Sequence, residues 1–144
     1  ERLDAALAIA GRAPGPVTSE LPGPTGEANQ YTTHARPPVL CLGPGSDCAA
    51  AQADAIRKLG GVAVVSHGKV PPEALVALGG FSAAIWWGDE DGARAYRRAL
   101  AGRAGPILTL ITGQPDKGHA RAERHVCIDT TASGGNAALL GGNM

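Results

Sequence analysis

The most suggestive chemical pattern in this chain is a glycine-rich turn, Gly43-Pro44-Gly45, followed by Ser46. The turn lies between a short apolar run and a stretch that can form a helix, which is where proteins bind the phosphates of a dinucleotide. Gly43, Gly45 and Ser46 are therefore the candidate cofactor-binding residues. Pro44 weakens this interpretation, because proline has no backbone N–H to donate to a phosphate.

Two further parts of a dinucleotide fingerprint are missing. The pattern needs Gly or Ala three residues after its second glycine, and Cys48 stands there, although Ala49 follows. It also needs an acidic residue at the end of the next strand to bind the ribose hydroxyls, where His67 and Gly68 stand instead. We therefore favour a tight strand-to-helix turn and expect this chain to bind no cofactor. A nucleotide-binding module remains the alternative.

The three cysteines, Cys41, Cys48 and Cys127, could act as nucleophiles only if a neighbouring base lowered their pKa. Cys41 and Cys127 lie among aliphatic residues in predicted strands, so we expect both to be buried structural thiols. Cys48 lies near a predicted helix N-terminus, which favours the thiolate, but no histidine is close to it in the sequence. An odd number of cysteines in apolar surroundings argues against a disulfide framework and favours a reducing, cytoplasmic location.

Acidic and histidine residues give no better site. Asp89, Glu90 and Asp91 follow a predicted strand, and a cluster that caps the next helix explains them more simply than a metal or acid site. Ser133 and Gly134 lack the strand–turn–helix context of a hydrolase nucleophile. The histidines show no metal-ligand spacing with one another or with the cysteines: His34, His67, His119 and His125. We expect no catalytic residue and no metal site in this chain.

The elements that surround the turn alternate regularly between strand and helix. Short apolar runs predict four strands, at residues 39–42, 62–66, 81–87 and 106–111. Capping and stop residues predict three helices between them: from Ser46 or Asp47 to Leu59, from Pro71 to Leu78, and from Asp89 to Ala101. This order predicts a Rossmann-like α/β domain over residues 39–112, with a mainly parallel sheet covered by helices on both faces.

The flanking segments differ from this core. Residues 1–12 predict a short helix from a preceding domain, and residues 13–38, dense in Pro, Gly, Ser and Thr, predict a surface linker. Residues 113–123 are polar and predict a loop. Residues 126–130 predict a last strand with no helix after it, either at the edge of a sheet or lent to a neighbouring subunit. A tail follows to residue 144.

Composition sets the remaining limits. The 144 residues suit one small domain, and 13 basic residues balance 13 acidic ones, which argues against nucleic-acid binding. No apolar run approaches the ~20 residues of a membrane-spanning helix. Aromatic residues make up only 3% of the chain, so small aliphatic side chains must build the core. Each of these buries little area, so we expect the domain to depend on a partner surface or on the rest of a longer chain.

Two stretches together resemble the C-terminal region of the bifunctional proline utilization A flavoenzymes. The first is Leu21-Pro22-Gly23-Pro24-Thr25-Gly26-Glu27 with Asn29 and Tyr31. The second is Val126-Cys127-Ile128-Asp129-Thr130-Thr131-Ala132-Ser133-Gly134-Gly135-Asn136-Ala137-Ala138-Leu139-Leu140. Residues 81–89 and 105–107 match between them, in order. The chain departs from the family at Ala28, where a basic residue is usual, at Asp129, where Asn is usual, and in its last four residues.

The resemblance implies a specific role. Members of that family oxidise proline to glutamate with an FAD-dependent proline dehydrogenase and an NAD-dependent glutamate-semialdehyde dehydrogenase. The intermediate passes between the two sites through a tunnel. The motifs of those two sites have no counterpart in this sequence. By position, the terminal strand would associate with a second subunit and the tail would help to close the tunnel. The implied interaction residues are Val126, Cys127, Ile128, Asp129, Thr130, Gly134, Gly135 and Asn136.

We therefore expect a non-catalytic region of a larger proline-catabolic oxidoreductase, with the remainder of that enzyme and a second subunit as its partners. Two alternatives stay open: a stand-alone nucleotide-binding domain, and a stand-alone module that pairs through its last strand.

Overall fold

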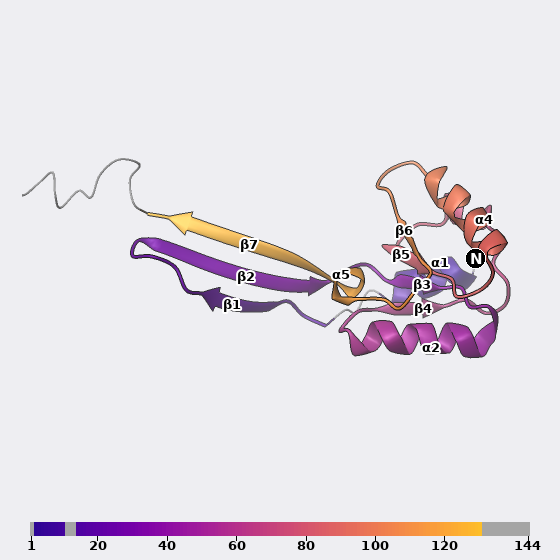
Figure 1. The fold of residues 1–144 in the computed structure, drawn as a ribbon, viewed down its shortest axis with the longest axis horizontal. Coiled ribbons are helices and arrows are strands. Elements are labelled where there is room, and N and C mark those ends of the chain that lie inside the picture. Colours follow the sequence, from indigo (N-terminus) through magenta and orange to yellow (C-terminus); the bar gives the residue numbers. More distant parts are fainter. Residues whose placement is uncertain (1, 11–13, 131–144) are drawn as a thin grey trace, which may run out of the picture. The chain divides into compact units, whose positions relative to one another are not determined.

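A computed structural model describes residues 2–10 and 14–130 of the chain, and Figure 1 shows their helices and strands. Contacts divide the chain into two units. The first comprises Glu1–Gly15 with Ala35–Ala122, and the second comprises Pro16–His34 with Glu123–Met144. In the described part of the chain, no helix is long and apolar enough to cross a membrane.

The first unit is built on a parallel sheet. Its strands are β3 (Val39–Cys41), β4 (Ala63–Val65), β5 (Ala83–Ile85) and β6 (Thr109–Ile111), in the order β4-β3-β5-β6. Every adjacent pair is parallel. Each strand lies inside one of the four apolar runs, so the prediction of an α/β fold with four parallel strands is confirmed.

Helices cover both faces of this sheet, as predicted. Along β3, Val39 and Cys41 pack on one face against α2 (Gly45–Lys58). The alternate residue Leu40 packs on the other face in a cluster that also contains residues of three further helices. These are α1 (Arg2–Ile9), α3 (Ala74–Ala77) and α4 (Glu90–Ala101). Figure 1 shows α2 and α4 on opposite sides of the sheet. Alternation of side chains along a strand therefore supplies both layers of the core.

The start of α2 differs from the prediction. Neither Ser46 nor Asp47 caps this helix; Pro44 is the N-cap residue, and no side chain caps the first turn. The reason lies in the backbone before it. Gly43 has a φ of +92° and Gly45 a φ of +77°, which turn the chain directly into the helix. The glycines place Ser46 and Asp47 inside the first turn rather than before it.

The second unit contains strands where the sequence predicted a linker. Within residues 13–38 lie two antiparallel strands, β1 (Val17–Leu21) and β2 (Glu27–Ala35), with Val17 opposite Thr33 and Leu21 opposite Asn29. Their sequences hide the strands because neither alternates apolar and polar residues. β1 is exposed throughout, so burial imposes no period on its sequence.

The predicted loop over residues 113–123 is also corrected. It contains α5 (Lys117–Ala120), which Asp116 caps by accepting a hydrogen bond from the backbone N–H of His119. The strand β7 (Arg121–Asp129) begins earlier than expected, and it pairs with β2 in a three-stranded sheet of order β1-β2-β7. Figure 1 shows β7 and β2 running in opposite directions. β7 is thus an edge strand, one of the two predicted possibilities.

Candidate functional site

The loops after three parallel strands line an open cleft in the first unit. Residues that follow β3, β4 and β5, together with one side of α4, line a cleft of about 770 Å³. After β3 the chain adds β4 on one side of that strand, and it then returns to add β5 on the other side. The position between β3 and β5 is therefore a topological switch point. Open α/β sheets bind their ligands in the crevice at such a point.

The walls of this cleft are mainly apolar. Leu42, Pro44, Pro72, Trp86 and Tyr96 line it. The two aromatic rings are tilted against each other with their centroids 5.2 Å apart. The indole N–H of Trp86 donates to the carbonyl of Asp89 at 3.0 Å, and the hydroxyl of Tyr96 donates to the carbonyl of Val70 at 2.7 Å. The polar atoms of both aromatic residues are therefore already used inside the protein.

Sequence reasoning missed the residue that holds the glycine turn. Gln52, on α2, is fully buried. Its Oε1 accepts from the N–H of Gly43 at 3.0 Å, and its Nε2 donates to the carbonyl of the same residue at 2.7 Å. The signal was a polar residue on the apolar stripe of Ala49, Ala53 and Ile56, which together face the sheet.

The sequence-predicted cofactor residues do not come together as a dinucleotide site. Gly43 is buried, and its N–H is donated to Gln52. Gly45 lines the cleft, whereas Ser46 is exposed on the first turn of α2. After β4, the cleft is lined by Gly68 and Lys69, with no carboxylate placed to hold a ribose. These residues do not fit a dinucleotide.

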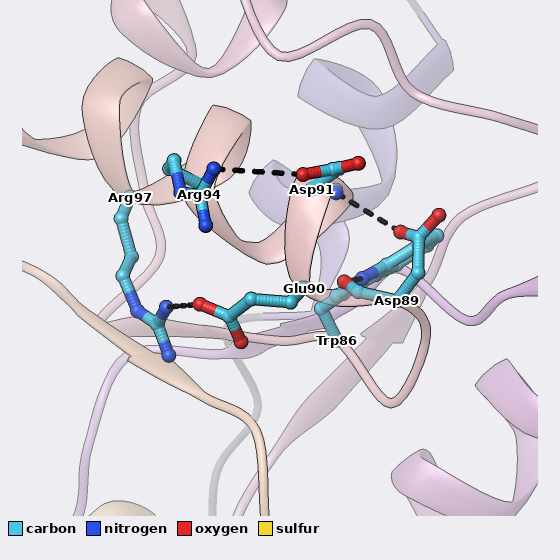
Figure 2. A network of polar contacts seen from close by, with 7 residues as sticks. Trp86, Asp89, Glu90, Asp91, Arg94 and Arg97 are labelled. Carbon is cyan, nitrogen blue, oxygen red and sulfur yellow. Dashed lines mark hydrogen bonds and ion pairs between the residues drawn. The ribbon is translucent and has the colours of Figure 1, made fainter.

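The acidic cluster after β5 caps α4, as the sequence suggested. The carboxylate of Asp89 accepts from the N–H of Gly92 at 2.9 Å. Glu90 pairs with Arg97 at 2.9 Å, and Asp91 pairs with Arg94 at 3.5 Å (Figure 2). Within the described ranges, no group of three or more His, Cys, Asp or Glu side chains could hold a metal ion.

This arrangement predicts unequal effects for two neighbouring substitutions. We expect Asp89→Ala to lower the free energy of unfolding by about 1 kcal/mol, because it leaves the N–H of Gly92 without its cap. Glu90→Ala removes only an exposed ion pair and should cost less than about 0.5 kcal/mol. Urea unfolding of both variants measures the difference, and equal losses would contradict the capping role.

The cysteines are placed differently from one another. Cys41 is buried as expected, and desolvation raises the pKa of its thiol to about 12. Cys48 is partly buried, with its Sγ 3.7 Å from the Nε2 of Gln52. The expectation for Cys127 is wrong, because this residue is exposed. Its neighbours in the sequence are aliphatic, but β7 belongs to a sheet with almost no buried side chains.

The second unit carries a polar ladder between β2 and β7. Asn29 donates to the Oε1 of Glu27 at 2.8 Å, and its Oδ1 lies 3.1 Å from the Nε2 of His125. The thiol of Cys127 donates to the same Glu27 oxygen at 3.2 Å. A hydrogen bond to Glu123 raises the pKa of Tyr31. The contacts of His125 with Asn29, of Cys127 with Glu27 and of Glu123 with Tyr31 join β7 to β2.

The ladder predicts how Cys127 reacts. Its hydrogen bond to the Glu27 carboxylate raises the pKa of the thiol, because the bond needs the proton. We expect Glu27→Gln to lower that pKa and to speed alkylation of Cys127 by iodoacetamide near pH 8. Mass spectrometry of the labelled peptides measures the rate, and the buried Cys41 serves as the internal control that stays unlabelled. An unchanged rate at Cys127 would contradict the role of Glu27.

The predicted interaction residues lie at the end of this sheet. Val126 is half-buried, whereas Cys127, Ile128, Asp129 and Thr130 are exposed. Thr130 donates from both its N–H and its hydroxyl to the carbonyl of Gly26, at 2.7 and 2.6 Å. The other three, Gly134, Gly135 and Asn136, lie outside the described residues.

Comparison with known proteins supports the resemblance. No protein-family model matches the sequence. The chain is 32% identical over 149 aligned positions to the bifunctional protein PutA of Salmonella typhimurium, and 30% identical to the PutA proteins of Escherichia coli and Rhizobium meliloti. The alignments cover 83–84% of this chain but only 11–12% of each relative. The chain thus spans about a tenth of the length of the relatives it matches.

Proposed function

Because the chain is homologous to a segment of the bifunctional PutA proteins, consistent with their C-terminal region, we propose that it is a non-catalytic part of a proline-catabolic enzyme. The parent oxidises proline to glutamate in two steps, with FAD and NAD bound elsewhere. This region supports association with a second subunit and closure of the substrate tunnel. Its doubly wound parallel sheet, of order β4-β3-β5-β6, serves as a scaffold rather than as a cofactor site.

One observation carries the proposal of a docking role. In the second unit, Asn29 is the only buried residue among those described. A three-stranded sheet needs a hydrophobic face or a packing partner to be stable. Val17, Leu21 and Ile128 are instead exposed by 64%, 41% and 56%. The sheet therefore lacks a core of its own, and a surface on another subunit or domain would supply one.

The edge of the sheet supports the same role. The strand order β1-β2-β7 leaves one side of β7 without a strand neighbour among the described residues. Such an edge offers a row of N–H and C=O groups that can add to another sheet. Main-chain pairing of this kind is a common mode of association.

The absence of catalysis is tested directly on the purified 144-residue chain. With proline and an artificial electron acceptor, or with glutamate semialdehyde and NAD, we expect no turnover above the background without protein. Adding FAD should not change this result. Measurable turnover of either substrate would overturn the proposal.

The docking role is tested by deletion. Removing residues 126–144 should reduce the number of chains in the assembly. Removing residues 131–144 alone should leave association through β7 in place. Light scattering coupled to gel filtration measures both variants against the full chain. An unchanged assembly without residues 126–144 would remove the role proposed for the strand.

A nucleotide-binding module remains the second candidate, because the cleft lies at the switch point where such ligands bind. Calorimetric titration with NAD and AMP separates the two proposals. The leading proposal predicts no heat of binding for either nucleotide, since the N–H of Gly43 is already donated to Gln52.

A further inference from the structure

The cleft above β3, β4 and β5 has the form of a binding site, independent of the docking role proposed for the other unit. Its volume of about 770 Å³ lies within the range that holds a small organic ligand. Three separate loops contribute to it, through Gly45, Gly68 and Gly88. The fold therefore brings together residues that are far apart in the sequence.

The two aromatic residues of the cleft have no free polar group to offer a ligand. Trp86 and Tyr96 line the cleft, but their N–H and O–H groups are bonded to carbonyls of the protein. Leu42 and Pro72 add aliphatic surface beside the rings. Trp86 is 9% exposed and Tyr96 only 2%, so a ligand would meet a small part of the Trp86 ring together with hydrocarbon, which selects a compact apolar body.

The charged groups around the cleft favour a negative charge. Its two lining carboxylates are engaged: Asp89 accepts from Gly92, and Asp91 pairs with Arg94. Lys69 also lines the cleft, is exposed, and has no ion pair within residues 2–10 and 14–130. The uncapped first turn of α2, which begins beside Pro44, adds a weaker attraction for an anion. Among the charged side chains that line the cleft, Lys69 is thus the one without a partner in the described part of the chain.

We propose that the cleft binds a small organic carboxylate, whose apolar body packs against Pro72, Ala95 and the exposed part of Trp86 while its carboxylate pairs with Lys69. A charge-assisted hydrogen bond of this kind is stronger than a neutral one. A dinucleotide is disfavoured, because Gly43 has no free N–H and no acidic residue follows β4 in the cleft.

Three probes of the same shape test the charge. Isotope-labelled full chain is titrated with 3-phenylpropionate, with its neutral amide and with 3-phenylpropylamine, and NMR shifts are followed. The indole signal of Trp86 should shift saturably with the carboxylate. We expect its Kd to be at least about fivefold lower than that of the amide, with no saturable binding of the amine. This comparison decides the proposal on the unmodified protein.

Two variants with matched controls locate the binding. Lys69→Met should weaken binding of the carboxylate about fivefold or more and leave that of the amide unchanged, while Lys58→Met, at an exposed site on α2, should change neither. Ala95→Leu, which fills the cleft from α4, should abolish binding, and the exposed Ala50→Leu should not.

Several outcomes would overturn the proposal. They are equal affinity for the three probes, no saturable binding of the carboxylate, binding that survives Ala95→Leu, and tighter binding of AMP or NAD than of the carboxylate. Circular dichroism of each variant confirms that its fold is retained.

Discussion

Replacing Gln52 with Leu is expected to lower the free energy of unfolding by about 2 kcal/mol. The side chains have similar volumes, so the loss does not come from a cavity. It comes mainly from the buried N–H of Gly43, which loses its acceptor, whereas the carbonyl of Gly43 loses one donor and keeps the N–H of Trp87 at 2.9 Å. Buried polar groups without partners cost about 1–3 kcal/mol each.

Urea unfolding followed by circular dichroism measures this loss. Gln30→Leu is the matched control, because Gln30 is exposed and bonds only to the side chain of Glu20. Gln52→Glu adds a pH test: the acid can donate to the carbonyl of Gly43 only while it is protonated. Its deficit relative to the unmodified chain should be smaller at about pH 5 than at about pH 8. A Gln52→Leu variant as stable as the unmodified chain would contradict the role of this residue.

Replacing Ile128 with Lys is expected to raise the dissociation constant of the proposed assembly by at least about tenfold. Ile128 is 56% exposed on the edge strand β7, where the partner surface would cover it. Burying an unpaired ammonium against apolar surface is costly, so the variant should dissociate without losing its own fold.

Ile107→Lys is the matched control for this prediction. Ile107 is 95% exposed and belongs to the first unit, so the same change in charge should leave association unaltered. Sedimentation equilibrium measures both dissociation constants. Equal dissociation constants for the two variants would contradict docking through β7.

The parallel sheet was predictable because burial imposes a strong pattern on its strands. β3 packs on both faces, so Val39, Leu40 and Cys41 form an uninterrupted apolar run. The glycine pairs that follow α2 and α3, Gly60-Gly61 and Gly79-Gly80, then mark where the chain turns back to the sheet. The class, the strand number and the helices on both faces all followed from this signal.

The antiparallel sheet was not predictable in the same way. β1 and β2 are exposed or half-buried along nearly their whole length, so no period-two pattern separates their faces. The prolines and glycines between residues 13 and 26 suggested a linker, although Pro22, Gly23 and Gly26 in fact lie in the connection between the two strands.

The glycine turn joins a strand to a helix, as the sequence predicted. Its likeness to a nucleotide site follows from Gly43 and Gly45, and the missing acidic residue after β4 was visible in the sequence. The role of Gln52 was not predicted: its place on the apolar stripe of α2 indicates burial, but the sequence does not show which backbone groups it bonds. The exposure of Cys127 was likewise hidden, since it depends on which sheet β7 joins.

Sedimentation velocity of the full chain across concentration tests the central claim most directly. We expect a species heavier than the 14.5 kDa monomer at about 500 µM that dissociates towards the monomer near about 1 µM. The exposed apolar residues of the β1-β2-β7 sheet would then be covered in the heavier species. A single 14.5 kDa species at every concentration would contradict the account.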